Sequence, residues 1–261
     1  MTTATLIVNN HSPRSRDSLK LSSSLLQVRT GGWGSLEYAA ERPGQIPGGR
    51  WKPLHHLYSQ GLMRSVFTAC GIDGRHAGNL SCYVVNDGHR PFTGSVKLEA
   101  VDLSTGTSRV MLHKRVSLPA GPGVREWFAP DSVLEPTTHA LLVSDSEGTE
   151  MMAGLVPLNT MELKPAKVTC TIDAAHEQVV SLTCASDAVA VYVVLTTAAH
   201  GRFEPNAFFL SGSRDVKFLS WNGTADKELL KSSLRVDHAA KWPLYPPTPA
   251  PPPKPNPPAP P

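Results

Sequence analysis

Short runs of alternating apolar and polar residues, each ended by turn-forming residues, fill the chain between residues 65 and 158. Successive side chains of a β-strand point to opposite faces, so this alternation predicts strands with one buried face. Seven runs show it: 65–70, 80–85, 95–103, 108–118, 124–128, 140–144 and 152–158. Their number and regular spacing favour an immunoglobulin-like sandwich of two antiparallel sheets.

The run 95–103 shows the alternation clearly. Its apolar positions are Val96, Leu98, Ala100 and Leu103, and its charged positions are Lys97, Glu99 and Asp102. We expect the apolar set to face a core and the charged set to face water, as in an antiparallel sheet. A parallel sheet would need helical patterns of about ten to fifteen residues between its strands, and none occurs here.

Turn signals separate the predicted strands. They include Asn86-Asp87-Gly88, Ser104-Thr105-Gly106 and residues 120–123. Glycine and asparagine tolerate positive φ and proline fixes a bend, so these residues are typical of tight connections.

A second set of predicted strands follows Pro165. Its members are 167–173, 178–184, 189–196, 207–210, 216–221 and 234–236. The β-branched and aromatic run 189–195 is the strongest strand signal in the chain, and we expect it at the centre of a sheet. The sequence therefore predicts an all-β protein with two antiparallel, immunoglobulin-like β-sandwiches, of which the second is smaller.

The two ends of the chain have a different character. Residues 1–32 are rich in Ser, Thr, Asn and Arg and are expected to be disordered or to form a short helix. Residues 50–58 have the pattern of a short amphipathic helix. Residues 241–261 hold half of the 24 prolines, which predicts a disordered, extended tail. That tail is either a ligand for a partner of the SH3 or WW type or an inert spacer.

Composition excludes several kinds of partner. The chain has 261 residues, 18% of them charged, and a formal net charge of +3 without a long basic run. We therefore expect no nucleic acid partner. Neither an apolar stretch long enough to cross a membrane nor a secretory leader is evident, so we expect no membrane association, and the sequence assigns no compartment.

Four cysteines, Cys70, Cys82, Cys170 and Cys184, lack C-x-x-C spacing and do not cluster with the histidines, which argues against zinc. One interpretation is that the cysteines are small buried side chains. A disulfide between Cys70 and Cys82 is an alternative. If the second pair lies on a hairpin that turns at residues 174–177, each cysteine faces a residue about three positions from the other. On that register we expect no Cys170–Cys184 disulfide.

The common catalytic motifs are missing. The sequence contains no G-x-S-x-G, G-x-x-x-x-G-K-[ST] or H-E-x-x-H motif, and the glycine-rich residues 44–49 do not end in Lys-Ser or Lys-Thr. His55 and His56 are neighbours, so on a helix they point about 100° apart and cannot both face one site. We expect them to pack or to meet solvent rather than to act as bases.

Other residues that could bind a ligand or take part in catalysis also have simpler interpretations. Trp33, Trp51 and Trp127 have flat faces that stack on sugars, but core packing is the more common use of tryptophan. The carboxylates of Glu37, Glu41, Asp73 and Asp87 form no marked pair, and the sequons Asn79-Leu80-Ser81 and Asn222-Gly223-Thr224 matter only on the secretory route. We therefore assign no catalytic, cofactor-binding or metal-binding residue and expect no cofactor.

Several segments resemble β-mannosidases of glycoside hydrolase family 2. Residues 33–38 and 49–56 are similar to the W-x-S-[IL]-[DE]-Y-x-G-[RK]-W-K-x-L-H-Y stretch at the end of that family's barrel. Residues 81–87 are similar to the strand that opens its first C-terminal sandwich. Residues 201–210 and 216–221 resemble the G-R-F-S-D-N-x-F-x-L and V-x-F-x-x-W signature of its last sandwich.

The sequence departs from the family at a few places. Residues 39–47 interrupt the first motif, His56 replaces its tyrosine, and Glu204-Pro205 replaces Ser-Asp. The resemblance covers residues 33–236. It implies these parts: 1–32 unassigned, 33–58 a remnant of the barrel end, 59–158 and 159–240 two sandwiches, and 241–261 the tail.

The resemblance also implies what the chain does. A retaining glycosidase needs two carboxylic acids, about 5 to 5.5 Å apart. In the family both lie upstream of the first matching motif, where this chain has residues 1–32. The resemblance therefore implies an accessory part of an enzyme that removes terminal β-mannose, inactive alone, with its own barrel and mannose-containing oligosaccharides as partners. The parent family is lysosomal, vacuolar or secreted. The alternatives are a stand-alone carbohydrate- or protein-binding module, a scaffold recruited through the tail, and a complete small hydrolase.

Overall fold

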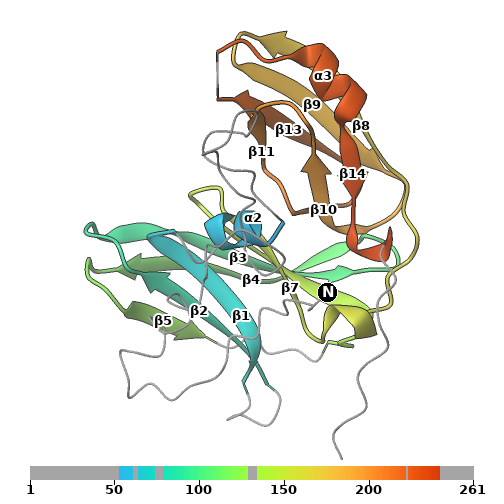
Figure 1. Ribbon diagram of the computed structural model, residues 1–261. Helices are drawn as coiled ribbons and strands as arrows, with labels where there is room; N and C mark the ends of the chain where they lie inside the picture. Colours follow the sequence, from blue (N-terminus) through green and yellow to red (C-terminus); the bar gives the residue numbers. More distant parts are fainter. Residues whose placement is uncertain (1–52, 61–63, 74–78, 129–133, 222, 242–261) are drawn as a thin grey trace, which may run out of the picture.

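Two β-sandwiches make up the part of the chain described by the computed structural model, which comprises residues 53–60, 64–73, 79–128, 134–221 and 223–241 (Figure 1). Each sandwich contains one three-stranded and one four-stranded antiparallel sheet. This arrangement confirms the predicted all-β class and the two-sandwich architecture. The predictions for residues 1–52 and for the tail from residue 242 lie outside the described residues.

The first sandwich follows helix α2, Pro53–Gln60, which confirms the predicted short helix. The sheets have the orders β1-β2-β5 and β4-β3-β6-β7. The strands are β1 Val66–Asp73, β2 Asn79–Asn86, β3 Phe92–Asp102, β4 Ser108–Leu118, β5 Val124–Phe128, β6 His139–Asp145 and β7 Glu150–Gly154, followed by the 3-10 helix η1 Leu158–Thr160. Each of the seven predicted runs therefore overlaps a strand.

The second sandwich has the sheet orders β11-β13-β9-β8 and β12-β10-β14. The elements are β8 Val168–His176, β9 Val179–Ser186, β10 Ala190–Thr196, β11 Gly201–Glu204, β12 Phe208–Leu210, β13 Ser213–Ser220, α3 Lys227–Ser233, β14 Arg235–Asp237 and the 3-10 helix η2 Ala239–Lys241. Strand β10 lies at the centre of its sheet, as its β-branched sequence predicts.

Strand β11 and helix α3 of the second sandwich were not predicted. Strand β11 contains glycine and two charged residues, a composition with weak strand propensity. It pairs with β13, and this pairing brings Phe203 against Phe218 with 5.2 Å between ring centroids. Helix α3 is only seven residues long, and its start is fixed by Asp226, whose carboxylate accepts a hydrogen bond from the Leu229 amide. Tertiary packing stabilises both elements.

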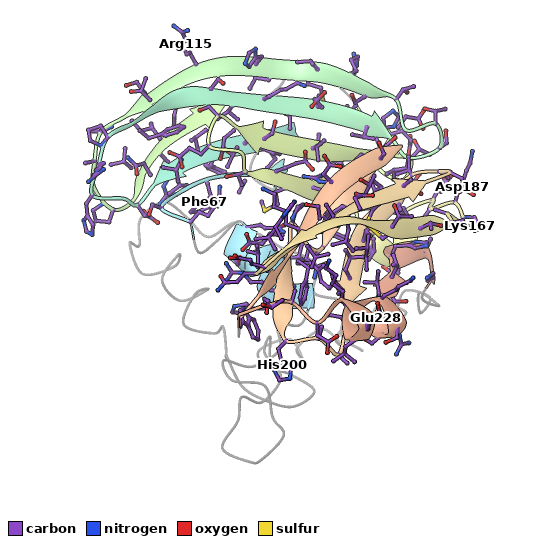
Figure 2. All side chains as sticks on the ribbon, turned by 90° about the horizontal axis from the view of Figure 1, so that it is seen from above. Phe67, Arg115, Lys167, Asp187, His200 and Glu228 are labelled. Atoms are coloured by element: carbon purple, nitrogen blue, oxygen red, sulfur yellow. A yellow bond between two sulfur atoms is a disulfide. The ribbon has the colours of Figure 1, made fainter. Side chains whose placement is uncertain are left out.

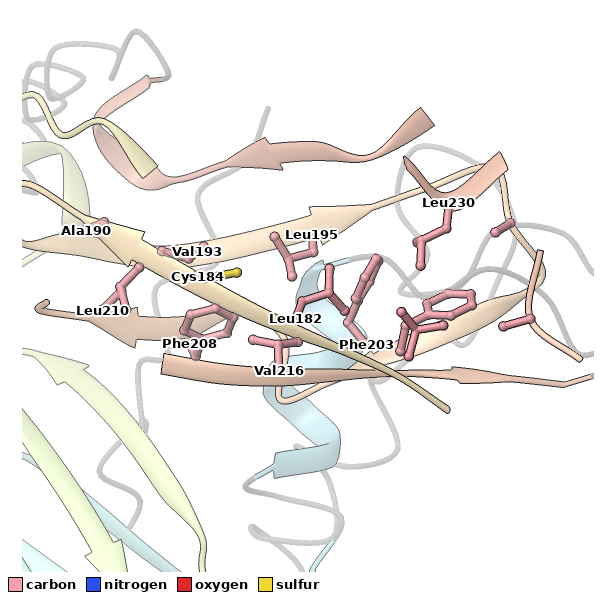
Figure 3. Close-up of a cluster of buried hydrophobic side chains, with 14 residues drawn as sticks. Leu182, Cys184, Ala190, Val193, Leu195, Phe203, Phe208, Leu210, Val216 and Leu230 are labelled. Atoms are coloured by element: carbon pink, nitrogen blue, oxygen red, sulfur yellow. The ribbon is translucent and has the colours of Figure 1, made fainter. Parts of the chain in front are cut away.

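Each sandwich has its own apolar core between its two sheets. The core of the second sandwich is shown in Figure 3 and includes Leu182, Val193, Leu195, Phe203, Phe208, Leu210, Val216, Phe218 and Leu230. The first core includes Val84, Val96, Leu98, Val116, Leu141 and Val143. No helix in the described part of the chain is long and apolar enough to cross a bilayer.

Both cysteine pairs form disulfides, each across a hairpin. Cys70 faces Cys82 in the β1–β2 pair, so the open alternative is confirmed there. Cys170 also faces Cys184 directly and is bonded to it, so the expectation of no bond was wrong. The β8–β9 hairpin turns between His176 and Val179, at the far end of the expected turn at residues 174–177, and a bulge between Ile172 and Ala174 shifts the register. The alternation of residues carried no signal for that bulge.

Candidate functional site

An apolar cluster joins the two sandwiches, and we call it the seam. Its buried members come from both sandwiches and from the segments between them: Leu103, Ala140, Met152, Met161, Val189, Val191 and Ala239. Leu103 was expected in the core of the first sandwich, but it lies in the seam instead. Val101, on the same face of β3 as Lys97, is fully buried. The prediction that this whole face of β3 meets water was therefore wrong, because the second sandwich packs against one end of the sheet.

Arg214 of β13 ties the sandwiches together at the edge of the seam. Its guanidinium forms an ion pair with Glu150 of β7 and donates a hydrogen bond to the carbonyl oxygen of Phe209 at 3.3 Å. The same group lies 5.3 Å from the centroid of the Phe208 ring. An arginine suits this position because its planar group can pair with a carboxylate and stack on an aromatic face at once.

The Arg214→Met variant should lower the free energy of unfolding by about 1 to 2 kcal/mol, the sum of a half-exposed ion pair and a cation–π contact. Arg214→Lys should recover part of the loss, since it keeps the charge but not the planar group. Urea titration measures both. As a control, the Arg235→Met change in β14 removes an exposed arginine and should have a smaller effect. Equal effects of the Arg214 and Arg235 changes to Met would contradict a specific role for Arg214.

Helix α2 is seated on the second sandwich through Asn206, which is buried. The Oδ1 atom of Asn206 accepts hydrogen bonds from the amides of Leu195 at 2.8 Å and Ala207 at 3.0 Å, and its Nδ2 donates to the Leu195 carbonyl at 2.9 Å. The Nε2 atom of His56 lies 3.2 Å from the same Nδ2. From the end of α2, Gln60 donates a hydrogen bond to the Asn206 carbonyl. One asparagine thus links α2 to β10.

These contacts fix the protonation state of His56. Because Oδ1 of Asn206 accepts two backbone hydrogen bonds, the atom that faces His56 is the Nδ2 donor, and the Nε2 of His56 must accept. The imidazole is therefore neutral and carries its proton on Nδ1. Burial, reinforced by the charges of His55 and Arg202, lowers the pKa of His56 to about 4. Burial also lowers the pKa of His55.

Both histidines are buried side chains of α2, as the packing interpretation expects. Neighbouring residues of a helix point in different directions, but this argument from the sequence did not say which histidine makes a specific contact. The structure gives the contact with Asn206 to His56. That position carries tyrosine in the family motif quoted above, so the replacement changes the group that meets Asn206.

Several of the described carboxylates lie in turns or on exposed strands. Asp87 accepts the Gly123 amide at 2.6 Å, and hydrogen bonds from Ser104 lower the pKa of Asp102. Asp173 and Asp215 meet at the hydroxyl of Thr183, and both are exposed, whereas a glycosidase acid needs a desolvated site. Across the described residues, no group of three or more His, Cys, Asp and Glu side chains is placed to hold a metal ion.

Several candidate residues cannot be assigned a contact. Trp33, Trp51, Glu37 and Glu41 lie outside the described residues. The side chains of Trp127 on β5, Asp73 on β1 and Asn79 on β2 are likewise not described, and neither is Asn222. Sugar stacking by the tryptophans and glycosylation of the sequons stay predictions.

Sequence reasoning missed the role of Arg214 and Asn206. A single arginine in a strand forms no motif, and its importance arises only because Glu150 comes from the other sandwich. Asn206 belongs to the quoted signature of the last sandwich, and that signature was the one signal available. The signature does not say which backbone groups the amide would meet.

A comparison with protein families identifies the second sandwich. Residues 163–242 match the model of Ig_mannosidase, an Ig-fold domain. The second sandwich is thus similar to the Ig-fold domain of mannosidases. This confirms the predicted resemblance for the C-terminal part of the chain, and β8 to β14, α3 and η2 lie within the matched residues.

One solved structure extends the likeness in fold beyond the second sandwich. A β-D-mannosidase from Dictyoglomus thermophilum aligns with a TM-score of 0.58 at 18% identity, over 79% of this chain and 24% of that one. An exo-chitosanase from Amycolatopsis orientalis aligns with a TM-score of 0.46 at 13% identity, over 79% of this chain and 28% of that one. The chain thus spans about a quarter of the length of the β-mannosidase. No curated protein matches the sequence significantly.

Proposed function

We propose that this chain serves as the accessory, non-catalytic sandwich part of a β-mannosidase-like glycoside hydrolase. In this role the two sandwiches brace a catalytic barrel that removes terminal β-linked mannose from oligosaccharides. Residues 33–58 represent the end of that barrel, residues 59–158 and 159–240 the two sandwiches, and residues 241–261 an added tail. Carbohydrate and the barrel are the partners of the complete enzyme.

The observation that carries this proposal is the seam with helix α2 seated beside it. A brace must hold its parts at a fixed angle, and the seam, the Arg214–Glu150 pair and the Asn206–His56 contact all join segments that are distant in sequence. Helix α2 also belongs to the motif that resembles the end of a barrel. The Ig_mannosidase match and the fold of the D. thermophilum enzyme support the same role.

Turnover of an aryl β-D-mannoside by the purified chain tests this proposal. We expect none above the buffer rate, because exposed turn carboxylates lack the spacing and desolvation that glycoside hydrolysis needs. The D. thermophilum β-mannosidase at equal concentration is the positive control. Reproducible turnover that a single Asp→Asn or Glu→Gln replacement abolishes would instead make the chain a complete hydrolase.

Calorimetric titration with manno-oligosaccharides separates a brace from a carbohydrate-binding module. A brace should give no saturable heat, whereas a binding module should give a saturable signal that a non-mannose oligosaccharide of equal length does not reproduce. The second result would replace the brace by an independent binding function.

A further inference from the structure

A β-bulge lies in strand β10, within the part of the strand that contributes to the seam. Two pairs with β12 flank it, and these are Ala190–Leu210 and Val193–Phe208. Val191 and Tyr192 therefore lie together opposite one residue, Phe209, which is the arrangement that defines a bulge. Tyr192 has a φ of 53°, in the left-handed region that is strained for a residue with a bulky side chain.

The bulge lets one strand supply two apolar surfaces. Ala190, Val193 and Leu195 belong to the core of the second sandwich, whereas Val191 belongs to the seam and Tyr192 packs against it. In a regular strand successive side chains alternate between the two faces, so residue 192 would point into the core and Val193 would point away from it. The extra residue therefore allows Val191 and Tyr192 to face the first sandwich without removing Val193 from the core.

Strand β10 begins near the first sandwich and runs away from it. Figure 2 shows Asp187, which comes shortly before β10, near the first sandwich, and His200, which comes shortly after it, on the far side of the second. The bulge thus lies toward the end of the strand that meets the first sandwich. Burial raises the pKa of the Tyr192 phenol, as expected for a ring that packs in an apolar contact.

The strand opposite the bulge is also held to the first sandwich. Phe209 packs against the seam, and its carbonyl oxygen accepts a hydrogen bond from Arg214, which pairs with Glu150 of β7. The hydroxyl of Ser211 donates a hydrogen bond at 3.3 Å to the carbonyl oxygen of Gly106, in the turn between β3 and β4. The bulge therefore lies among contacts that reach two separate parts of the first sandwich.

We propose that this bulge is a positioning device, which turns the Tyr192 ring into the seam and thereby sets the relative orientation of the two sandwiches. Strained backbone persists where the surrounding contacts fix it. A strand one residue shorter would keep the core of the second sandwich, so the bulge serves the contact between the sandwiches rather than the fold of either one. This assignment does not rest on the proposed enzymatic role, because it concerns the two sandwiches alone.

Deletion of Tyr192 from the full chain tests the proposal. The shortened strand regains strict alternation, with Ala190, Val193 and Leu195 still directed into the core. Amide residual dipolar couplings measure the orientation of each sandwich, and in the parent chain both sets should fit one alignment tensor. In the deletion variant each sandwich should still fit its own fold, but the magnitudes of the two tensors should differ by about twofold or more, because domains without a fixed interface move relative to each other.

Deletion of Asp173 is the matched control. Asp173 is the extra residue of the bulge in β8, it is exposed, and it lies outside the seam. Its removal also shortens a bulged strand of the second sandwich by one residue while the flanking pairs can stay in register. This variant should keep one common alignment tensor for the two sandwiches.

The Tyr192→Gly variant guards against a folding defect in the deletion variant. Glycine adopts a positive φ without strain, so the bulge stays and the ring is lost. The two tensors should differ in this variant as well. One common, parent-like tensor in either Tyr192 variant would overturn the proposal, and so would two different tensors in the parent chain. Failure of Tyr192→Gly to fold would overturn it too, since the ring would then be needed by the second sandwich itself.

Discussion

Loss of the Cys170–Cys184 disulfide should lower the free energy of unfolding by about 3 kcal/mol, the value that loop-closure entropy gives for a loop of this size. The two cysteines are 14 residues apart in sequence and join adjacent strands β8 and β9. Breaking the bond frees the unfolded chain more than the folded one, because β9 stays paired to β13 in the folded state. The Cys170→Ala/Cys184→Ala variant should show the loss as a lower urea midpoint.

A comparison of oxidised and reduced protein separates the effect of the bond from that of the small cavity that alanine leaves. In the Cys70→Ala/Cys82→Ala variant, Cys170–Cys184 is the remaining disulfide, since Cys70–Cys82 is the other one formed. Reduction of that variant should reproduce most of the loss of about 3 kcal/mol. If its oxidised and reduced forms unfold at the same urea concentration, the bond does not stabilise the second sandwich.

Acidification should destabilise the chain through His56. The pKa of His56 is about 4 in the folded state, below the ordinary value of 6.5 for histidine, so the unfolded state binds more protons between these two values. The free energy of unfolding should therefore fall as the pH falls from 6.5 to 4. A difference of this size corresponds to about 3 kcal/mol at most. Urea titrations at a series of pH values measure the slope.

The His56→Gln variant is the matching test. The Gln amide oxygen can accept from Asn206 Nδ2 as the neutral imidazole does, but it does not titrate. Its pH slope between 6.5 and 4 should be clearly smaller than that of the parent chain. His113→Gln, at an exposed position of β4, should keep the parent slope. A parent-like slope in His56→Gln would show that the acid sensitivity arises elsewhere, with His55 and His238 the next groups to test, since burial lowers both of their pKa values.

In the second sandwich, the pattern of residue types predicted a strand but not its irregularity. The run 189–195 is β-branched and aromatic, and it forms the central strand β10 as expected. The same pattern did not reveal that Tyr192 adopts a positive φ of 53°, where the register with β12 shifts. A bulge inserts a residue without changing which residue types are apolar, so the sequence period contains no record of it.

In the candidate site, too, local sequence patterns predicted the elements but not the contacts between them. His55 and His56 were recognised as packing residues of a short helix, and the quoted signature pointed to the segment that contains Asn206. The contact between His56 and Asn206, which are 150 positions apart in the sequence, follows from the arrangement of the two sandwiches. No local pattern specifies a contact at that separation, since it depends on how two separately formed surfaces fit.

By itself, the sequence determined most strands, the all-β class and the two sandwiches, because alternation and turn chemistry act between neighbouring residues. The likeness to β-mannosidase came instead from the quoted motifs. Only the tertiary structure decided the Cys170–Cys184 bond, the burial of Leu103 in the seam, the pairing of Arg214 with Glu150 and the neutral state of His56. Each of these depends on the register of a bulged hairpin or on the packing of one sandwich against another. Such properties are set by the whole chain when it buries its apolar surface.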